Sequence, residues 1–359
     1  MKYRNTVVLA EKDPGDAGTE IIPLNLIDII SRLTIGYRLK IGTDAWTAHP
    51  VANITRIELV DGSDVLFALD GYECQGLNIY DRRVPSMMHG ETMGGNHAFA
   101  TFGIDFGRYL FDEQLALDPA KFDNLVLKIT YAVTNSGATD DTHYLQVLAD
   151  VFDEKPVSPI GFLMSKQHWQ GTLKQNAYEY VILPTDFPIR QLLLRPFLTD
   201  FEPWITCVEA RLDEDNLKRI PFDWEIENYH RIMKGVWLPV DEGFCEYGDP
   251  GTAYKRYATP TDYHAVMLAA PSTVDDYFNT GVKPRGGMFY VSGHAMGVMT
   301  GRAWGWLPHH CIQFPFGDPK DMEDWYDIQA KGNVRLRLKG GAGATPGDAS
   351  VILQQLRRY

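Results

Sequence analysis

Apolar and polar residues alternate in short runs along most of the chain. The run NLVLKITYAV is the clearest case: one face carries polar Asn124, Lys128 and Thr130, and the other carries only apolar residues, which are Leu125, Leu127, Ile129, Tyr131 and Val133. A period of two predicts a strand with one buried face. Comparable runs follow one another from Thr19 to the C-terminus.

The pattern offers little that is typical of helices. GLNIYDRR (76–83) is one plausible short helix, but there is no long amphipathic helix and no regular alternation of strands with helices. The 32 glycines and 21 prolines are spread along the chain, as expected where turns join many short strands. The sequence therefore predicts an all-β protein and argues against the parallel α/β classes.

The strand pattern occurs twice along the chain, as an internal repeat. NLVLKI begins at Asn124 and NVRLRL at Asn333, and a Phe-Gly pair stands a similar distance before each. Further matches occur in the same order, and these are 28–32 with 186–190, 54–58 with 205–209, and 106–107 with 316–317. The offset rises from 151–158 to 209–210, which indicates an internal duplication with one long insertion in the second half.

Each half has room for about eight strands with Greek-key-like spacing, which is typical of a jelly roll. The predicted fold is therefore a double jelly roll of two tandem eight-stranded rolls, with short helices and a long insertion in the second roll. The expected parts are an N-terminal arm (1–18), a first roll (19–155), a linker (156–165) and a second roll (166–359). The insertion is expected at about 234–310. Two prolines and a glycine in DEKPVSPIG place the linker.

Composition narrows the class of protein. The chain has 359 residues, 45% of them apolar, which is enough for two domains with real cores. Its net charge of −13 argues against a protein that coats nucleic acid. The N-terminus has no apolar signal segment, and no apolar run is long enough to span a membrane. The four cysteines match no zinc pattern, so we interpret them as reduced core thiols of a protein made in the cytoplasm; they are Cys74, Cys207, Cys245 and Cys311.

Motifs for cofactor or metal chemistry are weak. GGAGATPG (340–347) superficially resembles a dinucleotide loop, but too few residues follow it for a βαβ unit, so a hairpin turn is expected. His309, His310 and Cys311 are the densest group of potential metal ligands, yet neighbours on a strand point to opposite faces. The acidic run 213–216 (Asp213, Glu214, Asp215 and Asn216) lacks the spaced oxygen ligands of a calcium loop and favours a solvated hairpin turn.

Two features in or near the insertion could bind or cleave sugars. Trp304 and Trp306 flank a glycine and could stack on a sugar ring, although such aromatics more often belong to a core or subunit interface. Glu242 with Asp275 and Asp276 could form a carboxylate pair for glycoside chemistry, but nothing fixes their separation. The sequence therefore assigns no catalytic, cofactor-binding or metal-binding residue, and we expect no enzyme and no cofactor.

Five stretches carry a resemblance to a known family. They are TEIIPLNLIDIISRLTIGYRL, ITRIELVDGSDVLFALDG, FGIDFGRYLFDEQLALDPAKFDNLVLKITY, AYEYVILPTDFPIRQLLLRPF and VEARLDEDNLKRIPFD. Together they resemble the double jelly-roll major capsid proteins of tailless icosahedral viruses, with the bacterial-virus members, often membrane-containing, most similar. The likeness covers most of residues 1–232, thins through the insertion and returns from Phe314. The family is defined by architecture more than by invariant residues.

The resemblance implies a structural protein of the virion. Three chains would form a homotrimer, and their six upright rolls would give a pseudo-hexagonal capsomer that tiles an icosahedral shell. Partners would be neighbouring capsomers and minor capsid, penton or spike proteins, without direct binding of nucleic acid. The N-terminal arm (1–18) would lie at the inner base, where it locks neighbours or meets an internal lipid membrane. The insertion would form an outer protrusion or fill the trimer interface.

Two other functions remain open on the same architecture. One is a two-jelly-roll amidase that releases glycans, which needs carboxylates between the rolls and is usually secreted. The other is a pair of carbohydrate-binding modules with Trp304 and Trp306 as the stacking platform. Electron microscopy of the purified protein distinguishes the capsid hypothesis, because it predicts trimers or shells.

Overall fold

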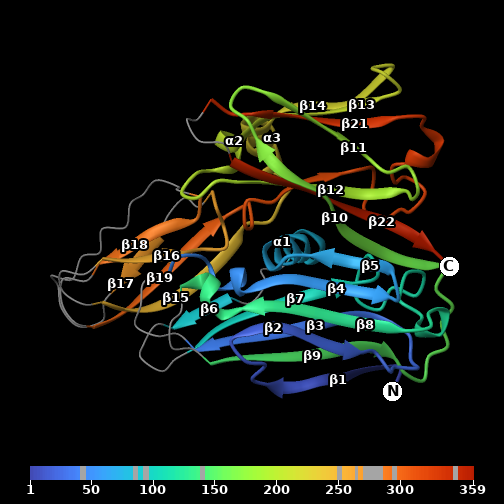
Figure 1. Ribbon diagram of the computed structural model, residues 1–359, viewed down its shortest axis with the longest axis horizontal. Coiled ribbons are helices and arrows are strands. Elements are labelled where there is room, and N and C mark those ends of the chain that lie inside the picture. Colours follow the sequence, from blue (N-terminus) through green and yellow to red (C-terminus); the bar gives the residue numbers. More distant parts are fainter. Residues whose placement is uncertain are drawn as a thin grey trace.

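The computed structural model shows two jelly rolls lying side by side, with a third group of strands projecting from one end (Figure 1). The predicted all-β double jelly-roll fold is confirmed. The structure describes the whole chain except residues 41–45, 84–87, 92–96, 138–141, 249–252, 263–265, 270–285, 293–296 and 343–346.

The first roll packs two sheets of four strands face to face. One sheet has the order β1-β9-β3-β7, formed by Tyr3–Lys12, His143–Phe152, Ile30–Lys40 and His97–Asp105. The other has the order β2-β8-β4-β5, formed by Ala17–Pro23, Leu125–Ala132, Ile54–Asp61 and Asp64–Leu69. Alternate residues of β8 are buried, as the period of two predicted.

The second roll repeats this order strand for strand. Its first sheet is β10-β22-β12-β20, formed by Gly161–Leu173, Gly347–Arg358, Ile189–Phe197 and Ile312–Pro315. Its second sheet is β11-β21-β13-β14, formed by Tyr178–Ile182, Val334–Gly340, Cys207–Glu214 and Arg219–Glu225. Each strand of the second roll therefore has one counterpart in the first.

The helices are short and occupy corresponding places. α1 (Gly71–Arg82) follows β5 and α3 (Ile226–Met233) follows β14, while α2 (Pro203–Thr206) is a single turn before β13. α1 lies between the two rolls (Figure 1). No helix among the described residues is long and apolar enough to cross a bilayer.

The two rolls share a sheet and a core. β5 of the first roll pairs in parallel with β10 of the second, with Phe67 opposite Ser165 and Ala68 opposite Lys166. This pairing joins four strands of each roll into one eight-stranded sheet. A buried apolar cluster also runs from the first roll into the second and includes core residues of both.

The strand ladders correct the register of the internal repeat. Asn124 and Asn333 do precede the corresponding strands β8 and β21. In the match of 54–58 with 205–209, however, the structure gives a different offset. A bulge follows Ile54 in β4 and Cys207 in β13, so these two residues are equivalent and the offset is 153 where the sequence match gave 151. Ile30 aligns with Ile189 for the same reason, an offset of 159 where the match gave 158. Short alternating runs look alike when slid by one or two residues, so sequence alone could not fix the offset.

The expected N-terminal arm is wrong. Residues 3–12 form β1, whose register with β9 places Tyr3 opposite Phe152 and Val7 opposite Leu148. Val8 and Leu9 of NTVVLA pack against the core at the edge of the sheet, and the flanking charges obscured this signal in the sequence. The expected linker also ends early, because β10 begins at Gly161.

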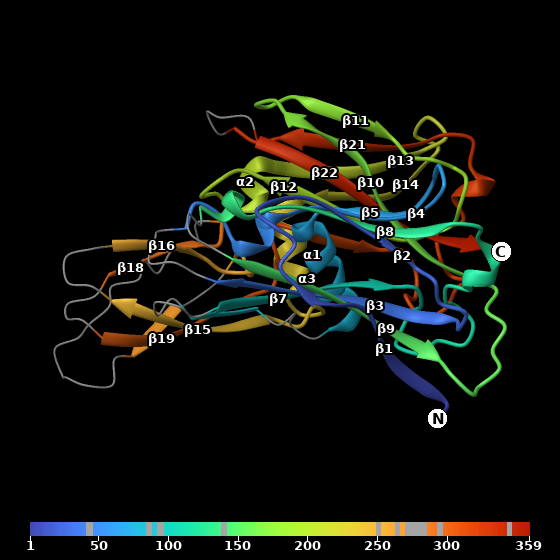
Figure 2. The same cartoon turned by 60° about the horizontal axis from the view of Figure 1, so that its bottom comes forward.

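The insertion extends the first roll instead of the second. β15 (Val240–Gly248) pairs in parallel with β6 (Met88–Glu91) beside β7, and β19 (Gly297–Gly305) and β17 (Val266–Ala269) continue that sheet. β16 (Ala253–Tyr257) and β18 (Met288–Ser292) form a separate two-stranded ribbon. Both views place these strands at the end of the molecule opposite the two termini (Figures 1 and 2).

Candidate functional site at the junction of the two rolls

α1 is fixed at its start by a capping box between the rolls. The Asp70 carboxylate accepts from the backbone N–H of Glu73 at 2.7 Å, and the Glu73 carboxylate accepts from the N–H of Asp70 at 3.2 Å. Glu73 also accepts from Gln167 at 2.8 Å and from the Ser350 hydroxyl at 2.6 Å, both in the second roll. Burial and the neighbouring Asp70 raise the pKa of Glu73 to about 7.

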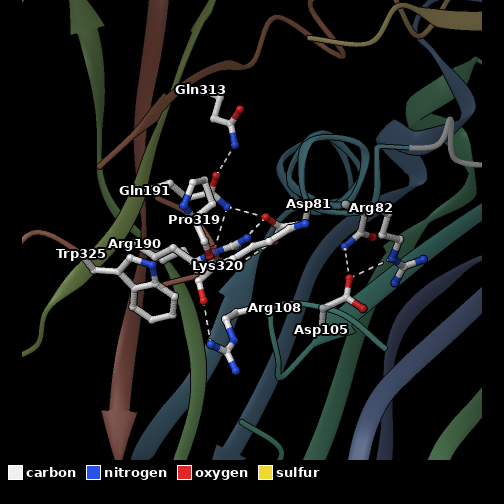
Figure 3. Close-up of polar contacts among 12 residues, drawn as sticks. Asp81, Arg82, Asp105, Arg108, Arg190, Gln191, Gln313, Pro319, Lys320 and Trp325 are labelled. Carbon is white, nitrogen blue, oxygen red and sulfur yellow. Dashed lines mark hydrogen bonds and ion pairs between the residues drawn. The ribbon is translucent and has the colours of Figure 1, made fainter. Parts of the chain in front are cut away.

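The other end of α1 carries a buried ion pair to the second roll. Figure 3 shows Asp81 receiving hydrogen bonds from Arg190 Nη1 at 2.6 Å and from Gln191 Nε2 at 2.7 Å, both on β12. Gln354 of β22 donates to the second carboxylate oxygen at 2.8 Å. Asp81 and Arg190 are each 6% exposed, so both charges are satisfied mainly by protein groups. A buried pair of this kind constrains how the two rolls meet.

Loops of the two rolls meet beside this pair. Arg108 of the first roll binds the buried Asp112 through Nε at 2.7 Å and donates through Nη1 to the backbone carbonyl of Lys320 at 2.7 Å. Nearby, Asp105 at the end of β7 accepts from Arg82 at 2.9 Å (Figure 3). Asp105 also pairs with Arg32. The Arg108 contact with Lys320 joins the two loops to each other, and the Arg82 contact ties the end of α1 to the end of β7.

A cavity of about 230 Å³ lies at the same junction. Its inner wall includes Tyr80, Trp237 and Gln313, and its rim includes Arg83 and Lys320. Tyr80 donates to the Cys311 carbonyl at 2.8 Å, and Trp237 Nε1 donates to Gln313 at 3.1 Å. The polar atoms of the wall are therefore bonded to the protein itself, which suits a packed junction better than a reactive centre.

Three buried histidines lie where both rolls and the insertion meet. The rings of His49 and His309 are 4.8 Å apart, and His310 Nε2 donates to the Phe201 carbonyl at 3.0 Å. Burial lowers the pKa of His49 and of His310 to about 3, and it lowers the pKa of His309 well below its ordinary value. The three imidazoles are therefore neutral near pH 7.

The structure separates the ligand candidates of the sequence. His309 and His310 lie in a turn with φ of 50° and 68°, not in a strand as expected, and His309 binds Gln75 at 2.5 Å. Cys311 is buried and free, as are Cys74 and Cys207, while the side chain of Cys245 lies outside the described residues. Among the described residues no group of three histidines, cysteines or carboxylates could hold a metal ion.

The acidic run does form the turn of a hairpin, between β13 and β14. Its first two carboxylates are not solvated, however: Asp213 and Glu214 are 3% and 2% exposed. Glu214 accepts from the Tyr326 hydroxyl at 2.8 Å, and Asp215 accepts from the backbone N–H of Gly332 at 2.9 Å. Their oxygens are used to brace the turn.

The sugar-chemistry candidates are not brought together. Glu242 is buried and accepts from the Thr259 backbone N–H at 2.7 Å, and burial raises its pKa to about 7. Asp275 and Asp276 lie outside the described residues. Trp304 and Trp306 are half-buried, and Trp306 packs against the apolar core with Lys234 4.7 Å from its ring.

GGAGATPG is not a hairpin turn. It connects β21 in one sheet of the second roll to β22 in the other, so the chain crosses between sheets there. A Cβ on Gly340 would lie 2.1 Å from the Lys174 carbonyl oxygen, so this glycine permits a close approach of two backbones.

Sequence reasoning missed the residues that join the rolls. Asp81 and Arg190 are 109 residues apart and carry no local motif. One signal was present: Gln354 and Gln355 interrupt the apolar run ASVILQQL, and polar residues in a buried strand indicate partners on another element.

Three solved structures that share the fold of this chain are viral capsid proteins. The STIV MCP is 9% identical over 99% of this chain and 96% of its own, with a TM-score of 0.61; STIV is Sulfolobus Turreted Icosahedral Virus. The major capsid protein P2 from Bacteriophage PM2 is 9% identical over 99% and 98%, with a TM-score of 0.57. The PBCV-1 virus capsid chain is 9% identical over 99% and 93%, with a TM-score of 0.56. No family model and no curated protein matches the chain.

Proposed function

We propose that this chain, which has the double jelly-roll fold of viral major capsid proteins, is the structural major capsid protein of an icosahedral virion. The observation that carries the proposal is the junction: two rolls of identical strand order are fused by a shared sheet and a buried polar network. Such a fusion fixes two building blocks at one angle, which a tiling subunit requires and a pair of flexibly linked domains does not provide.

The doubled roll explains the assembly unit. Three chains supply six similar rolls, so a homotrimer has the near-hexagonal outline that covers an icosahedral facet. A cyclic trimer needs contact between unlike faces of neighbouring copies, and the closed ring leaves none of these faces free. Neighbouring capsomers and minor capsid, penton or spike proteins are the further partners of this proposal.

The insertion is the proposed exterior of the capsomer. It projects from the end of the molecule opposite the termini (Figure 2), and its strands extend the sheet of the first roll. In this orientation it would present a surface to host or spike components. The residues at the other end, including both termini, would face the interior.

The two enzyme and binding alternatives find less support. A glycan-releasing amidase needs carboxylates accessible between the rolls, whereas Asp81 is 6% exposed and Glu73 is fully buried by its partners. A sugar platform needs exposed aromatic faces, whereas Trp306 packs on the core. We therefore propose no catalytic role for this chain.

The test is the assembly state of the purified protein. Light scattering should report a trimer of about 122 kDa, three times the chain mass of 40.6 kDa, and electron microscopy should show particles with a six-lobed outline. A monomer at micromolar concentration in mild buffer would refute the capsid proposal. Release of glycans from a glycoprotein by the same preparation would favour the amidase.

A further inference from the structure

The contact between the two rolls of one chain can be compared with the outer strands of the same chain, which are equivalent to the strands in that contact. β5, the last strand of its sheet in the first roll, pairs in parallel with β10, the first strand of its sheet in the second roll. The counterpart of β5 is β14, and the counterpart of β10 is β1. Both counterparts are outer strands of their sheets in the described part of the chain, so each presents backbone donors and acceptors along one edge.

The ladders give residue-level equivalence. Phe67 and Phe222 lie opposite Leu59 and Leu212 in their hairpins, and Ala68 corresponds to Asp223. On the other strand, equal bulges align Ser165 with Asn5 and Lys166 with Thr6. The pairs seen inside the chain therefore predict Phe222 opposite Asn5 and Asp223 opposite Thr6 of another copy.

The strands that meet between the rolls, β5 and β10, are more buried than their counterparts β14 and β1. The last four residues of β5 are buried, whereas β14 has none buried; its exposed positions include Asp223. The first five residues of β10 are buried, whereas β1 is half-buried or exposed throughout. What covers β5 and β10 is the opposite roll, so β14 and β1 lack an equivalent cover.

The helices of the two rolls can be compared in the same way, beginning with an apolar residue of α1. Leu77 lies between Glu73 and Asp81 on the face of α1 that meets β22, where Ile352 stands between their partners Ser350 and Gln354. Both Leu77 and Ile352 are buried.

Counted from the N-caps Asp70 and Glu225, Ile232 of α3 takes the place of Leu77, and it is 58% exposed. The counterpart of Ile352 is Leu148 of β9, which faces outward beside Val7, itself 57% exposed. An exposed apolar residue thus stands on each of two surfaces that the repeat brings together.

Charges at the two sites are complementary. Inside the chain, Asp64 at the start of β5 binds Arg357 at the end of β22 at 2.5 Å. Their counterparts by register are Arg219 of β14 and Asp153 after β9. The signs are exchanged, but the attraction is kept.

We propose that β14 and α3 of one copy dock on β1 and β9 of a second copy, repeating the contact between the rolls within each chain. The inference rests on the proposed trimer and names its interface. The contact joins unlike faces, so successive copies form a head-to-tail ring that closes at three chains and six rolls. β14 extends the first sheet of the neighbour as β5 extends the sheet of β10.

Cysteine cross-linking tests the register. The double variant Thr6→Cys, Asp223→Cys should form disulfides between copies under mild oxidation, giving dimers and trimers on a non-reducing gel and nothing larger. The single variants Thr6→Cys and Asp223→Cys are the controls and should give neither. A ladder that extends beyond trimers, or dimers alone, would contradict a closed head-to-tail ring.

Surface variants test the contact without touching the core. Ile232→Glu should shift the trimer–monomer equilibrium toward monomer at least tenfold, while the monomer keeps its thermal midpoint. The matched control is Ile182→Glu on β11, which is the edge strand opposite β14 in the second sheet of the second roll. The Ile182 side chain is 68% exposed, and this substitution should leave the trimer intact. Loss of trimer with Ile182→Glu alone would place the interface on β11 and overturn the inference.

Exchanging the two charges tests the interface separately from the proposed trimer. Arg219→Glu and Asp153→Arg should each weaken the trimer, and the double variant should restore it. If the wild-type protein is monomeric, the capsid proposal fails together with this interface. If it is trimeric but cross-links do not form and Ile232→Glu has no effect, only the interface is wrong.

Discussion

Single residues decide how firmly the rolls are joined, and Asp81 is the clearest example. Its carboxylate is the shared acceptor for Arg190, Gln191 and Gln354 in the second roll. Because Arg190 is also buried, loss of Asp81 would leave a guanidinium with carbonyl partners but no counter-charge.

We expect Asp81→Ala to lower the free energy of unfolding by about 3–5 kcal/mol, the usual cost of removing one partner of a buried ion pair. The matched control is Glu227→Ala, which breaks an exposed pair with Arg231 on α3 and should cost less than about 0.5 kcal/mol. Denaturant unfolding at fixed protein concentration measures both. Equal, small effects would mean that Asp81 does not hold the rolls.

The buried histidines predict loss of stability in acid. In the unfolded chain they take up protons as the pH falls below 6.5, whereas burial lowers the pKa of His49 and of His310 to about 3 in the folded protein. Their contribution to the free energy of unfolding is therefore complete above pH 6.5. It decreases as the pH falls toward 3, by about 1.4 kcal/mol per pH unit for each histidine. His309 acts in the same direction.

Glu73 and Glu242 oppose this effect over part of the range. Burial raises the pKa of each from 4.5 to about 7, so their contribution is complete below pH 4.5 and decreases as the pH rises to 7. Unfolding midpoints should therefore fall gently from pH 6.5 to 4.5 and steeply below 4.5. His310→Gln should make the steep part shallower; an unchanged slope would show that His310 is not a source of the acid sensitivity.

Among the elements, α1 depends on a glycine that helix propensity alone would disfavour. A Cβ on Gly76 would lie 2.6 Å from Cys311 Sγ and 3.1 Å from its Cβ, so α1 packs there at backbone distance. Replacement by alanine gains about 1 kcal/mol of helix propensity. Overpacking in a close-packed core costs about 1–3 kcal/mol, which is the larger effect.

We therefore expect Gly76→Ala to destabilise the protein, and Cys311→Ala to relieve most of that cost by removing the nearest atom. A double-mutant cycle of unfolding free energies measures the coupling. Additive effects of the two substitutions would show that the helix does not press on Cys311.

The sequence predicts elements better than contacts, for a physical reason. Alternation identifies strands such as β8 and β21 because one face of each is buried, and their shared Asn start exposes the duplication. Alternation does not fix pairing partners, so the parallel contact of β5 with β10 and the Asp81–Arg190 pair were out of reach. β1 was missed because its apolar residues are few and its edge is uncovered.

At the scale of the whole molecule, a buried carboxylate of the insertion helps to hold it to α3 of the second roll. Asp262 is 1% exposed; it binds His230 of α3 at 2.6 Å and accepts from the backbone N–H groups of Trp306 and Leu307 at 2.8 Å each. Burial alone would raise its pKa, but these hydrogen bonds lower the pKa below its ordinary value. Asp262 itself therefore lies in the buried interior and not on a free surface loop.

This anchor changes what a truncation of the insertion can show. Removing residues 241–285 would delete Asp262 with the outer strands, so a loss of soluble protein would report the missing anchor and not a lost surface function. A point substitution separates the two. Asp262→Ala leaves the β15–β19 pairing intact but strips both backbone donors and His230 of their acceptor.

We expect Asp262→Ala to loosen the insertion from the rolls while both rolls stay folded. Limited proteolysis should cut within residues 240–305 at least ten times faster than in the wild type, because local opening is favoured by the loss of a buried hydrogen-bonded charge, worth about 3 kcal/mol or more. The control is Asp241→Ala, whose pair with Arg302 lies on the surface of the same insertion and should change the cutting rate little. Cutting that spreads at once to the strands of both rolls would mean that the insertion and the rolls unfold as one unit.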